Sequence, residues 1–273
     1  MTDPFLDLLK SRPLIFDGAM GTSILGRQLT DEDFGGLKDC PEILVATRPE
    51  VIRDIHAAFL AVGCDAVETN SFGSGRIVLG EFGLADRVHE LNRKAAEVAR
   101  AACDEFRAPG RPRFVAGSIG PGTRLVTLGH VTFDVLRDVY EEQALGLLDG
   151  GADVLLIETC QDILQSKAAV IGVRDAMEKH GRQVPVMVQV TIEAQGTMLL
   201  GTEIGAAMVT LEALPVDVIG LNCGTGPKEM IDAVRHLSRH CTRFLSVLPN
   251  AGLPENVGGQ AHYHLTPDEL AAY

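Results

Sequence analysis

Short apolar runs alternate with longer segments of helical periodicity along most of this chain. The runs lie at 14–16, 66–67, 113–116, 154–157, 184–190, 216–221 and 244–248. They are mostly continuous rather than alternating in hydrophobicity, which is typical of parallel strands that helices cover on both faces. Repeated strand and helix units favour an α/β fold of the (β/α)8 TIM-barrel type, of which we expect about seven β/α units here.

The segments between these runs carry apolar residues at helical spacing. In 49–62, for example, Ile52, Ile55 and Phe59 fall on one side of a helix. Near the end of the chain Thr266 suits an N-cap and Pro267 a first helical residue, so a further helix should start there. The other predicted helices lie at 85–106, 133–148, 163–179, 203–214 and 228–240.

A doubly wound open sheet is the competing fold. It is less favoured because no GxGxxG motif follows the first predicted strand. Residues suited to function also follow most of the strands instead of gathering at one switch point. Since the chain has no low-complexity tract or linker, we interpret residues 1–273 as a single domain.

The chain ends at Tyr273, about two turns into the predicted seventh helix and before any eighth strand. A barrel that lacks one strand leaves two sheet edges and part of its core exposed. We therefore expect either that these residues are a fragment of a longer enzyme or that something outside them completes the barrel.

Charge and hydropathy argue against two classes of partner. Lys plus Arg number 24 against 37 Asp plus Glu, a net charge of −13 without a basic run, so we expect no nucleic acid partner. No apolar run approaches the roughly 20 residues that span a bilayer, and the N-terminus does not have a signal-peptide layout. We expect a cytoplasmic protein whose six scattered cysteines are reduced.

Three acids and a cysteine end four of the predicted strands: Asp17, Glu68, Glu158 and Cys223. In a barrel, side chains at the C-terminal strand ends line one mouth, so these four should converge. Each also has a plainer interpretation, because a strand-end carboxylate often caps the next helix and most cysteines after a strand are packed and inert. Together they suit a ligand whose ammonium group is held by carboxylates, with a metal or an electrophile near the sulfur.

Glycines follow several of the same strands, among them Gly18, Gly120 and Gly224. They allow tight turns, and they also let backbone N–H groups approach an anion such as a substrate carboxylate. The sequence leaves both interpretations open.

The strand-end motifs resemble those of the homocysteine S-methyltransferase family, and most closely the homocysteine-binding modules of its cobalamin-dependent members. The matches occur in the same order over nearly the whole chain, which is far more specific than any single motif. They are FDGAMGTSIL at 16–25, AVETNSFG at 66–73, GSIGPGTRL at 117–125, LLIETCQD at 155–162, VPVMVQVTIE at 184–193, DVIGLNCGTGP at 217–227 and LPNAGLPENVGGQAHYHLTPDEL at 248–270.

The resemblance implies a zinc-dependent barrel methyltransferase in which zinc holds the homocysteine sulfur as a nucleophilic thiolate. The thiolate attacks an activated methyl group and methionine leaves, so the reacting nucleophile belongs to the substrate and no catalytic side chain is assigned. By the same resemblance Cys223 is a zinc ligand, and Asp17 and Glu158 hold the amino group of the substrate. The remaining predicted substrate-binding residues are Gly18, Glu68 and Asn222.

The other two zinc cysteines of the family lie in a GGCCG motif at the end of the eighth strand, and this sequence lacks that motif. Cys241 is no substitute, because it ends a predicted helix on the opposite face of the barrel. Catalytic zinc usually has three protein ligands. We therefore expect little or no zinc-dependent activity from these residues alone.

Three methyl donors occur in the family: a methylated corrinoid, betaine and S-methylmethionine. A quaternary ammonium donor is usually held in an aromatic cage, and this chain has no Trp and three Tyr. The corrinoid is favoured, although the sequence contains no corrinoid-binding DxHxxG motif. A further domain or a separate protein would therefore carry the methylcobalamin.

Two other functions stay open. One is a metal-free module that binds homocysteine or a partner protein without turnover, which the missing strand and the missing cysteine pair support. The other is a lyase or aldolase barrel, which is less favoured because no strand-end Lys is available for a Schiff base.

Overall fold

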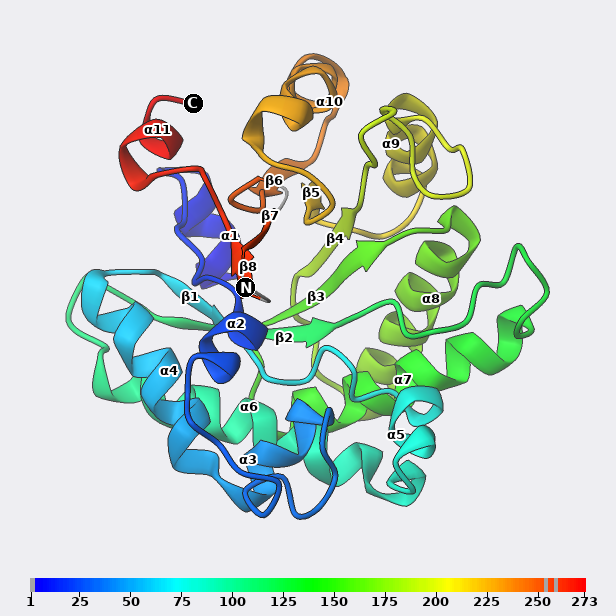
Figure 1. Cartoon of the computed structure of the whole chain (residues 1–273). Helices are drawn as coiled ribbons and strands as arrows, with labels where there is room; N and C mark the ends of the chain where they lie inside the picture. Colours follow the sequence, from blue (N-terminus) through cyan, green and yellow to red (C-terminus); the bar gives the residue numbers. More distant parts are fainter. Residues whose placement is uncertain (1–2, 253–254, 258–259) are drawn as a thin grey trace.

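The computed structural model describes residues 3–252, 255–257 and 260–273, so the last family-like stretch, 248–270, falls partly outside the described residues. Its centre is a six-stranded parallel sheet in the order β1-β2-β3-β4-β5-β6, which curls around an axis with helices outside it (Figure 1). The predicted α/β barrel fold is thus confirmed. The strands are β1 Ala66–Glu68, β2 Phe114–Ile119, β3 Val154–Cys160, β4 Val186–Val190, β5 Val218–Asn222 and β6 Phe244–Leu248.

The first predicted strand, 14–16, is reduced to a single parallel bridge between Phe16 and Ala66. It still lies beside β1, because the backbone N–H of Asp17 donates to the carbonyl of Ala66 at 3.1 Å. Pro13 before the run cannot donate to a ladder, and Asp17 and Gly18 follow it at once, so few residues are left to pair. With this bridge, the sheet accounts for all seven predicted strand positions.

The long helices lie within three residues of their predicted bounds. They alternate with the strands along the chain and cover the outside of the sheet (Figure 1). The predicted helix 85–106 begins instead as a 3₁₀ turn, η2 Ala85–Arg87, before α6. These helices are α4 Pro49–Val62, α6 Val88–Glu105, α7 Phe133–Asp149, α8 Ile163–His180, α9 Ile204–Glu212 and α10 Pro227–His240.

Near the C-terminus, α11 Pro267–Ala271 starts as predicted. Thr266 and Glu269 form a reciprocal capping box there. Several short elements were not predicted, because they are too brief to carry a periodic pattern. They are α1 Pro4–Leu9, α2 Met20–Leu25, η1 Pro41–Ile43, α3 Leu44–Thr47, α5 Arg76–Glu81 and the antiparallel pair β7 Glu255–Val257 and β8 Gln260–His262.

The N-terminal end of the barrel is closed by α1. Its Phe5 is buried and meets Phe114 of β2 edge to face, with ring centroids 5.3 Å apart. Inward residues of the neighbouring strands, including Leu156 and Met187, pack in the same cluster. The alternate strand residues pack against the helices in a larger cluster. With this end filled, a cavity inside the sheet opens at the C-terminal strand ends.

β6 differs from the inner strands. All residues of β2, β4 and β5 are buried, whereas β6 is only partly so. Within the described part of the chain β6 pairs with β5 alone, which leaves its other edge without a strand. Among the helices of the described residues, none is long and apolar enough to cross a membrane.

Candidate functional site

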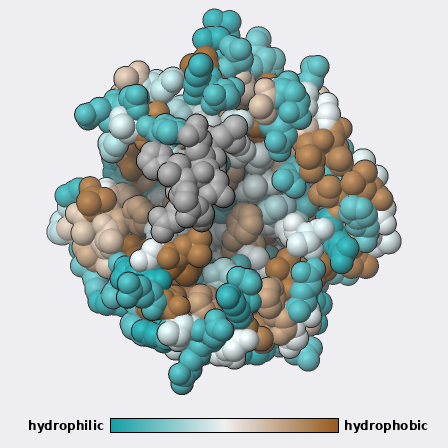
Figure 2. All heavy atoms as spheres, in the orientation of Figure 1, coloured by the Kyte–Doolittle hydropathy of each residue, from teal (hydrophilic) through white to brown (hydrophobic). Residues whose placement is uncertain are grey.

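A cavity of about 610 Å³ lies at the C-terminal ends of the strands. The six residues predicted to form the site all line it, although they come from segments spread over 200 positions of sequence: Asp17, Gly18, Glu68, Glu158, Asn222 and Cys223. Figure 2 shows the molecule in the orientation of Figure 1, with hydrophilic and hydrophobic side chains mixed over the face in view. Convergence at one mouth follows from the parallel strands, whose C-terminal ends share one edge.

Four carboxyl groups line this cavity, and three of them, those of Asp17, Glu68 and Glu158, interact with one another. Both oxygens of Asp17 accept the backbone N–H of Glu68, at 3.0 and 3.2 Å. Glu158 accepts from the hydroxyl of Ser118 at 2.6 Å. One oxygen of Glu68, Oε1, is buried and has no hydrogen-bond partner among the described residues. No Lys, Arg or His occurs among the described residues that line the cavity.

The pKa values of all three groups are raised. Burial raises the pKa of Glu158 to about 7, the hydrogen bond from Ser118 opposes the rise, and the charge of Asp17 adds to it. Burial also raises the pKa of Glu68 well above 4.5, followed by repulsion from Glu158 and Asp17. Burial likewise raises the pKa of Asp17. Buried carboxyls that share a site resist ionising together, so a cation that enters the cavity is favoured.

Asn222 connects the carboxyl side of the cavity to its thiol. Its side-chain oxygen accepts the backbone N–H of Thr159 at 2.8 Å. Its Nδ2 lies 3.0 Å from Oε2 of Glu158, 2.8 Å from Oγ1 of Thr159 and 3.4 Å from Sγ of Cys223. An amide has two N–H bonds for these three acceptors. The group therefore joins Glu158 and Cys223 in one hydrogen-bonded network.

Two residues of this network have left-handed backbone conformations. Thr159 has φ +56° and Cys223 has φ +54°. For the β-branched Thr159 this conformation is strained, and strain of this kind gathers at functional sites. A register shift between Ile157 and Cys160 accompanies it, where β3 pairs with β4. The bulge turns the Thr159 hydroxyl toward Sγ of Cys223, 3.9 Å away.

Sequence reasoning missed several polar residues at the site, among them Glu42, Ser118 and Thr159. Glu42 lines the cavity and accepts the backbone N–H of Gly73 at 2.9 Å. Gly73 permits this contact, because a Cβ there would lie 2.5 Å from Oε1 of Glu42. The position of Thr159 beside the predicted Glu158 was a usable signal, whereas Glu42 follows no predicted strand and gave none.

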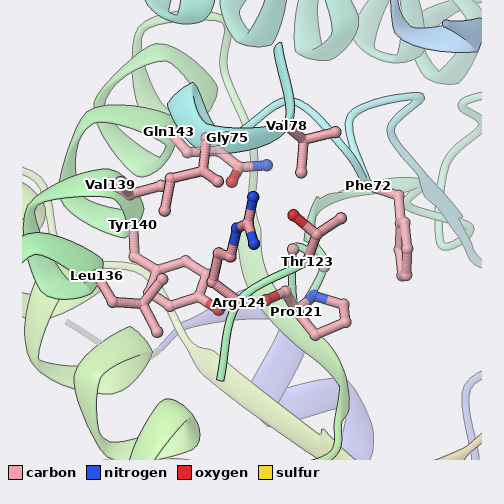
Figure 3. Close-up of a pocket in the computed structure, with 13 residues that line it drawn as sticks. Phe72, Gly75, Val78, Pro121, Thr123, Arg124, Leu136, Val139, Tyr140 and Gln143 are labelled. Atoms are coloured by element: carbon pink, nitrogen blue, oxygen red, sulfur yellow. Dashed lines mark hydrogen bonds between the residues drawn. The ribbon is translucent and has the colours of Figure 1, made fainter. Parts of the chain in front are cut away.

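A second cavity, of about 20 Å³, is lined by Phe72, Tyr140 and Gln143 among other residues (Figure 3). Phe72 also lines the first cavity. No Asp, Glu or Cys is among the described residues that line it. Its buried polar groups hold loops instead: Tyr140 donates to the carbonyl of Pro121 at 3.2 Å, and Gln143 donates to that of Ser71 at 2.7 Å. This space has room for about one water molecule. The side chains around it support the neighbouring loops, including the one after β2.

The residues available for a metal centre are fewer than zinc needs. Cys223 is half-buried and lines the cavity, as the zinc prediction requires. Within the described residues, however, no group of three or more His, Cys, Asp or Glu side chains is arranged to hold a metal ion. Cys241 follows the last residue of α10, away from the strand ends. The described residues thus offer one sulfur ligand and not a complete zinc site.

Comparison with known proteins agrees with the geometry. The chain is 54% identical over 266 residues to the methionine synthase of Mycobacterium tuberculosis and 53% identical to that of Mycobacterium leprae. Each match covers 97% of this chain and 22% of the relative, so the chain spans about a fifth of the length of these proteins.

The solved structure of the homocysteine methyltransferase MmuM from Escherichia coli, in its metallated form, is similar in fold. The TM-score is 0.77, with 24% sequence identity over 92% of this chain and 88% of that one. The sequence profile of homocysteine S-methyltransferases matches residues 14–273, which is nearly all of the chain. The chain therefore belongs to the homocysteine S-methyltransferase family.

Proposed function

We propose that this chain binds homocysteine and presents its sulfur for methylation, which gives methionine. The observation that carries the proposal is the cavity in which four carboxyl groups and one thiol meet, without a basic residue among the described residues that line it. Homocysteine has an ammonium group at one end and a sulfur at the other. The cavity has matching groups, and the relatives at 54% and 53% identity are methionine synthases.

Each end of the substrate has its own residues. Glu158 and Asp17 hold the α-ammonium group, and Glu68 adds a third carboxyl beside them. Gly18 has no side chain, so its backbone can approach the substrate at the mouth of the cavity. Asn222 keeps Glu158 in place through its 3.0 Å hydrogen bond. Binding of an ammonium group favours the ionised carboxyls and so offsets the repulsion among them.

The sulfur end of the substrate is methylated. A new S–CH₃ bond forms, the bond between the methyl carbon and its carrier breaks, and the thiol proton is lost. We propose a methylcorrinoid on another domain or a separate protein as donor. Phe72 is the only aromatic residue in the described lining of the cavity, which is poor material for a cage around a quaternary ammonium donor.

Zinc, when bound, would act as a Lewis acid that keeps the homocysteine sulfur as a thiolate at neutral pH. Cys223 would be one of its ligands, and its side chain lines the cavity. We propose that the other ligands come from outside the described residues. The solved relative from Escherichia coli is described as metallated, which supports a metal in this family's barrel.

The first experiment tests the ammonium subsite. Titration calorimetry would compare L-homocysteine with 4-mercaptobutanoate, which lacks the amino group, on the wild type and on Glu158→Gln. We expect Glu158→Gln to weaken L-homocysteine binding by at least about tenfold, the size of a charged hydrogen bond, with little effect on 4-mercaptobutanoate. Exposed Glu178→Gln on α8 is the matched control. Equal affinity of the wild type for both ligands would contradict the proposal.

The second experiment distinguishes an enzyme from a module that binds homocysteine without turnover. The described residues contain no group of three potential metal ligands, which favours the binding module for these 273 residues. The chain would be incubated with zinc, methylcobalamin and homocysteine. We expect homocysteine binding without methionine formation. Stoichiometric tight zinc together with turnover would show that the residues form a complete zinc site after all.

A further inference from the structure

His56 is a polar residue on the buried face of α4. Its side chain is fully buried, between the buried residues Ile55 and Leu60 of the same helix. Neither of its ring nitrogens has a hydrogen-bond partner among the described residues. A buried polar group without a partner costs about 1–3 kcal/mol, so an apolar side chain would fill this space more favourably. The residue at this position therefore calls for a reason other than packing.

A carboxylate of the cavity lies close to His56. Nδ1 of His56 lies 3.9 Å from Oδ2 of Asp17, whose side chain is itself only 1% exposed. This distance is longer than a hydrogen bond, and a movement of about 1 Å by either side chain closes it. The backbone N–H of Glu68 contacts the same carboxylate. Asp17 is thus placed between one backbone donor and one imidazole.

The approach of α4 to this point depends on Gly18. A Cβ on Gly18 would lie 3.1 Å from the ring of Phe59, which is tighter than ordinary contact. Phe59 lies three residues after His56, so both side chains project from the same part of the helix. The missing side chain at Gly18 therefore lets α4 pack directly beneath the mouth. This is a role for Gly18 beyond a tight turn.

The charges around Asp17 explain what an imidazole does there. Asp17 raises the pKa of both Glu68 and Glu158, so the three acids interact. Burial raises the pKa of Asp17 as well, whereas the interaction with His56 lowers it. His56 thus favours ionised Asp17 over its two neighbours.

We propose that His56 is a positioning residue for Asp17, which it holds as an oriented carboxylate for the ammonium group of an amino-acid substrate. The inference rests on the proposed function and adds a residue that touches no substrate. In this arrangement Nδ1 carries the ring hydrogen and, once the 3.9 Å gap closes, donates a hydrogen bond to Oδ2 of Asp17, while α4 supplies the rigid support.

The test compares two substitutions and two ligands. His56→Leu removes the donor, whereas His56→Asn places an amide N–H near the position of Nδ1. Calorimetry would measure L-homocysteine and 4-mercaptobutanoate on the full chain. We expect His56→Leu to weaken L-homocysteine at least about tenfold more than 4-mercaptobutanoate, as for a hydrogen bond to a charged group, and His56→Asn to restore most of the loss. His89→Leu, another histidine beside an aspartate but on the outer helices, is the control.

Each outcome decides the matter. An equal loss for both ligands, or no loss, would mean that His56 only fills the core. Should His56→Leu not fold, His56→Asn and His56→Gln would be compared instead. The amide of Asn lies near the position of Nδ1, whereas the amide of Gln lies near that of Nε2. Equal binding of L-homocysteine by these two variants would overturn the proposal. A wild type that binds neither ligand would instead overturn the proposed function, and this inference with it.

Discussion

The raised pKa of Glu158 makes the stability of this protein depend on pH in a defined direction. Glu158 is buried, and its pKa is about 7 in the folded protein against an ordinary 4.5. Its neighbours Asp17 and Glu68 are acids, and no basic residue lines the described cavity. Replacing it by Gln removes the titration and keeps the shape. Gln can still accept from Asn222 and donate to the hydroxyl oxygen of Ser118, which contact the two carboxyl oxygens now.

The magnitude follows from the difference between the two pKa values. The rise from 4.5 to about 7 at about 1.4 kcal/mol per pKa unit gives about 3 kcal/mol. Because the folded pKa is the higher one, the folded state binds the proton more tightly. The stabilisation is therefore fully present below pH 4.5 and is lost as the pH rises through 7. Most of the loss falls between pH 5 and pH 8.

Urea unfolding followed by circular dichroism at pH 5, 6, 7 and 8 measures this effect. The free energy of unfolding of Glu158→Gln minus that of the wild type should rise with pH. Between pH 5 and pH 8 this difference should increase by about 2–3 kcal/mol. Exposed Glu178→Gln should track the wild type at each pH. A constant difference between Glu158→Gln and the wild type from pH 5 to 8 would refute the reasoning, since it would place the folded pKa near its ordinary value.

Three further substitutions test the fold around the site, each by urea unfolding at pH 7. Gly220→Ala should destabilise by about 1–3 kcal/mol or more, because its Cβ would lie 2.2 Å from the carbonyl oxygen of Ser246; a change below about 0.5 kcal/mol would argue against this packing. Asn222→Ala should lower the free energy of unfolding by about 1–3 kcal/mol, since the N–H of Thr159 loses its acceptor. Unfolding of Asn222→Ala like that of the wild type would contradict this reasoning. Phe5→Ala should cost about 3–5 kcal/mol by opening the barrel floor, and a cost near zero would mean that α1 does not close it.

Much of the fold could be predicted from local sequence. Continuous apolar runs such as 154–157 and 216–221 indicated buried parallel strands, and α4 was predicted with its observed bounds. The first strand was only partly right, because Pro13 and Gly18 leave a single bridge at Phe16. Short helices such as α2 were missed, since six residues carry too little periodicity to stand out.

The convergence of Asp17, Glu158 and Cys223 was within reach of the sequence for a simple reason. Parallel strands place their C-terminal ends on one edge, so residues far apart in sequence meet there whatever their side chains do. The sequence by itself therefore determined that the six predicted residues face one cavity and that the family is that of the homocysteine S-methyltransferases.

Only the tertiary structure decided how those residues act on one another. The 3.9 Å between His56 and Asp17, the left-handed Thr159 opposite Cys223, and the buried Glu68 oxygen without a partner all depend on how separate segments pack. No local pattern encodes such distances, because hydrogen bonds and charge repulsion change within about 1 Å, whereas periodicity fixes only the face on which a residue lies.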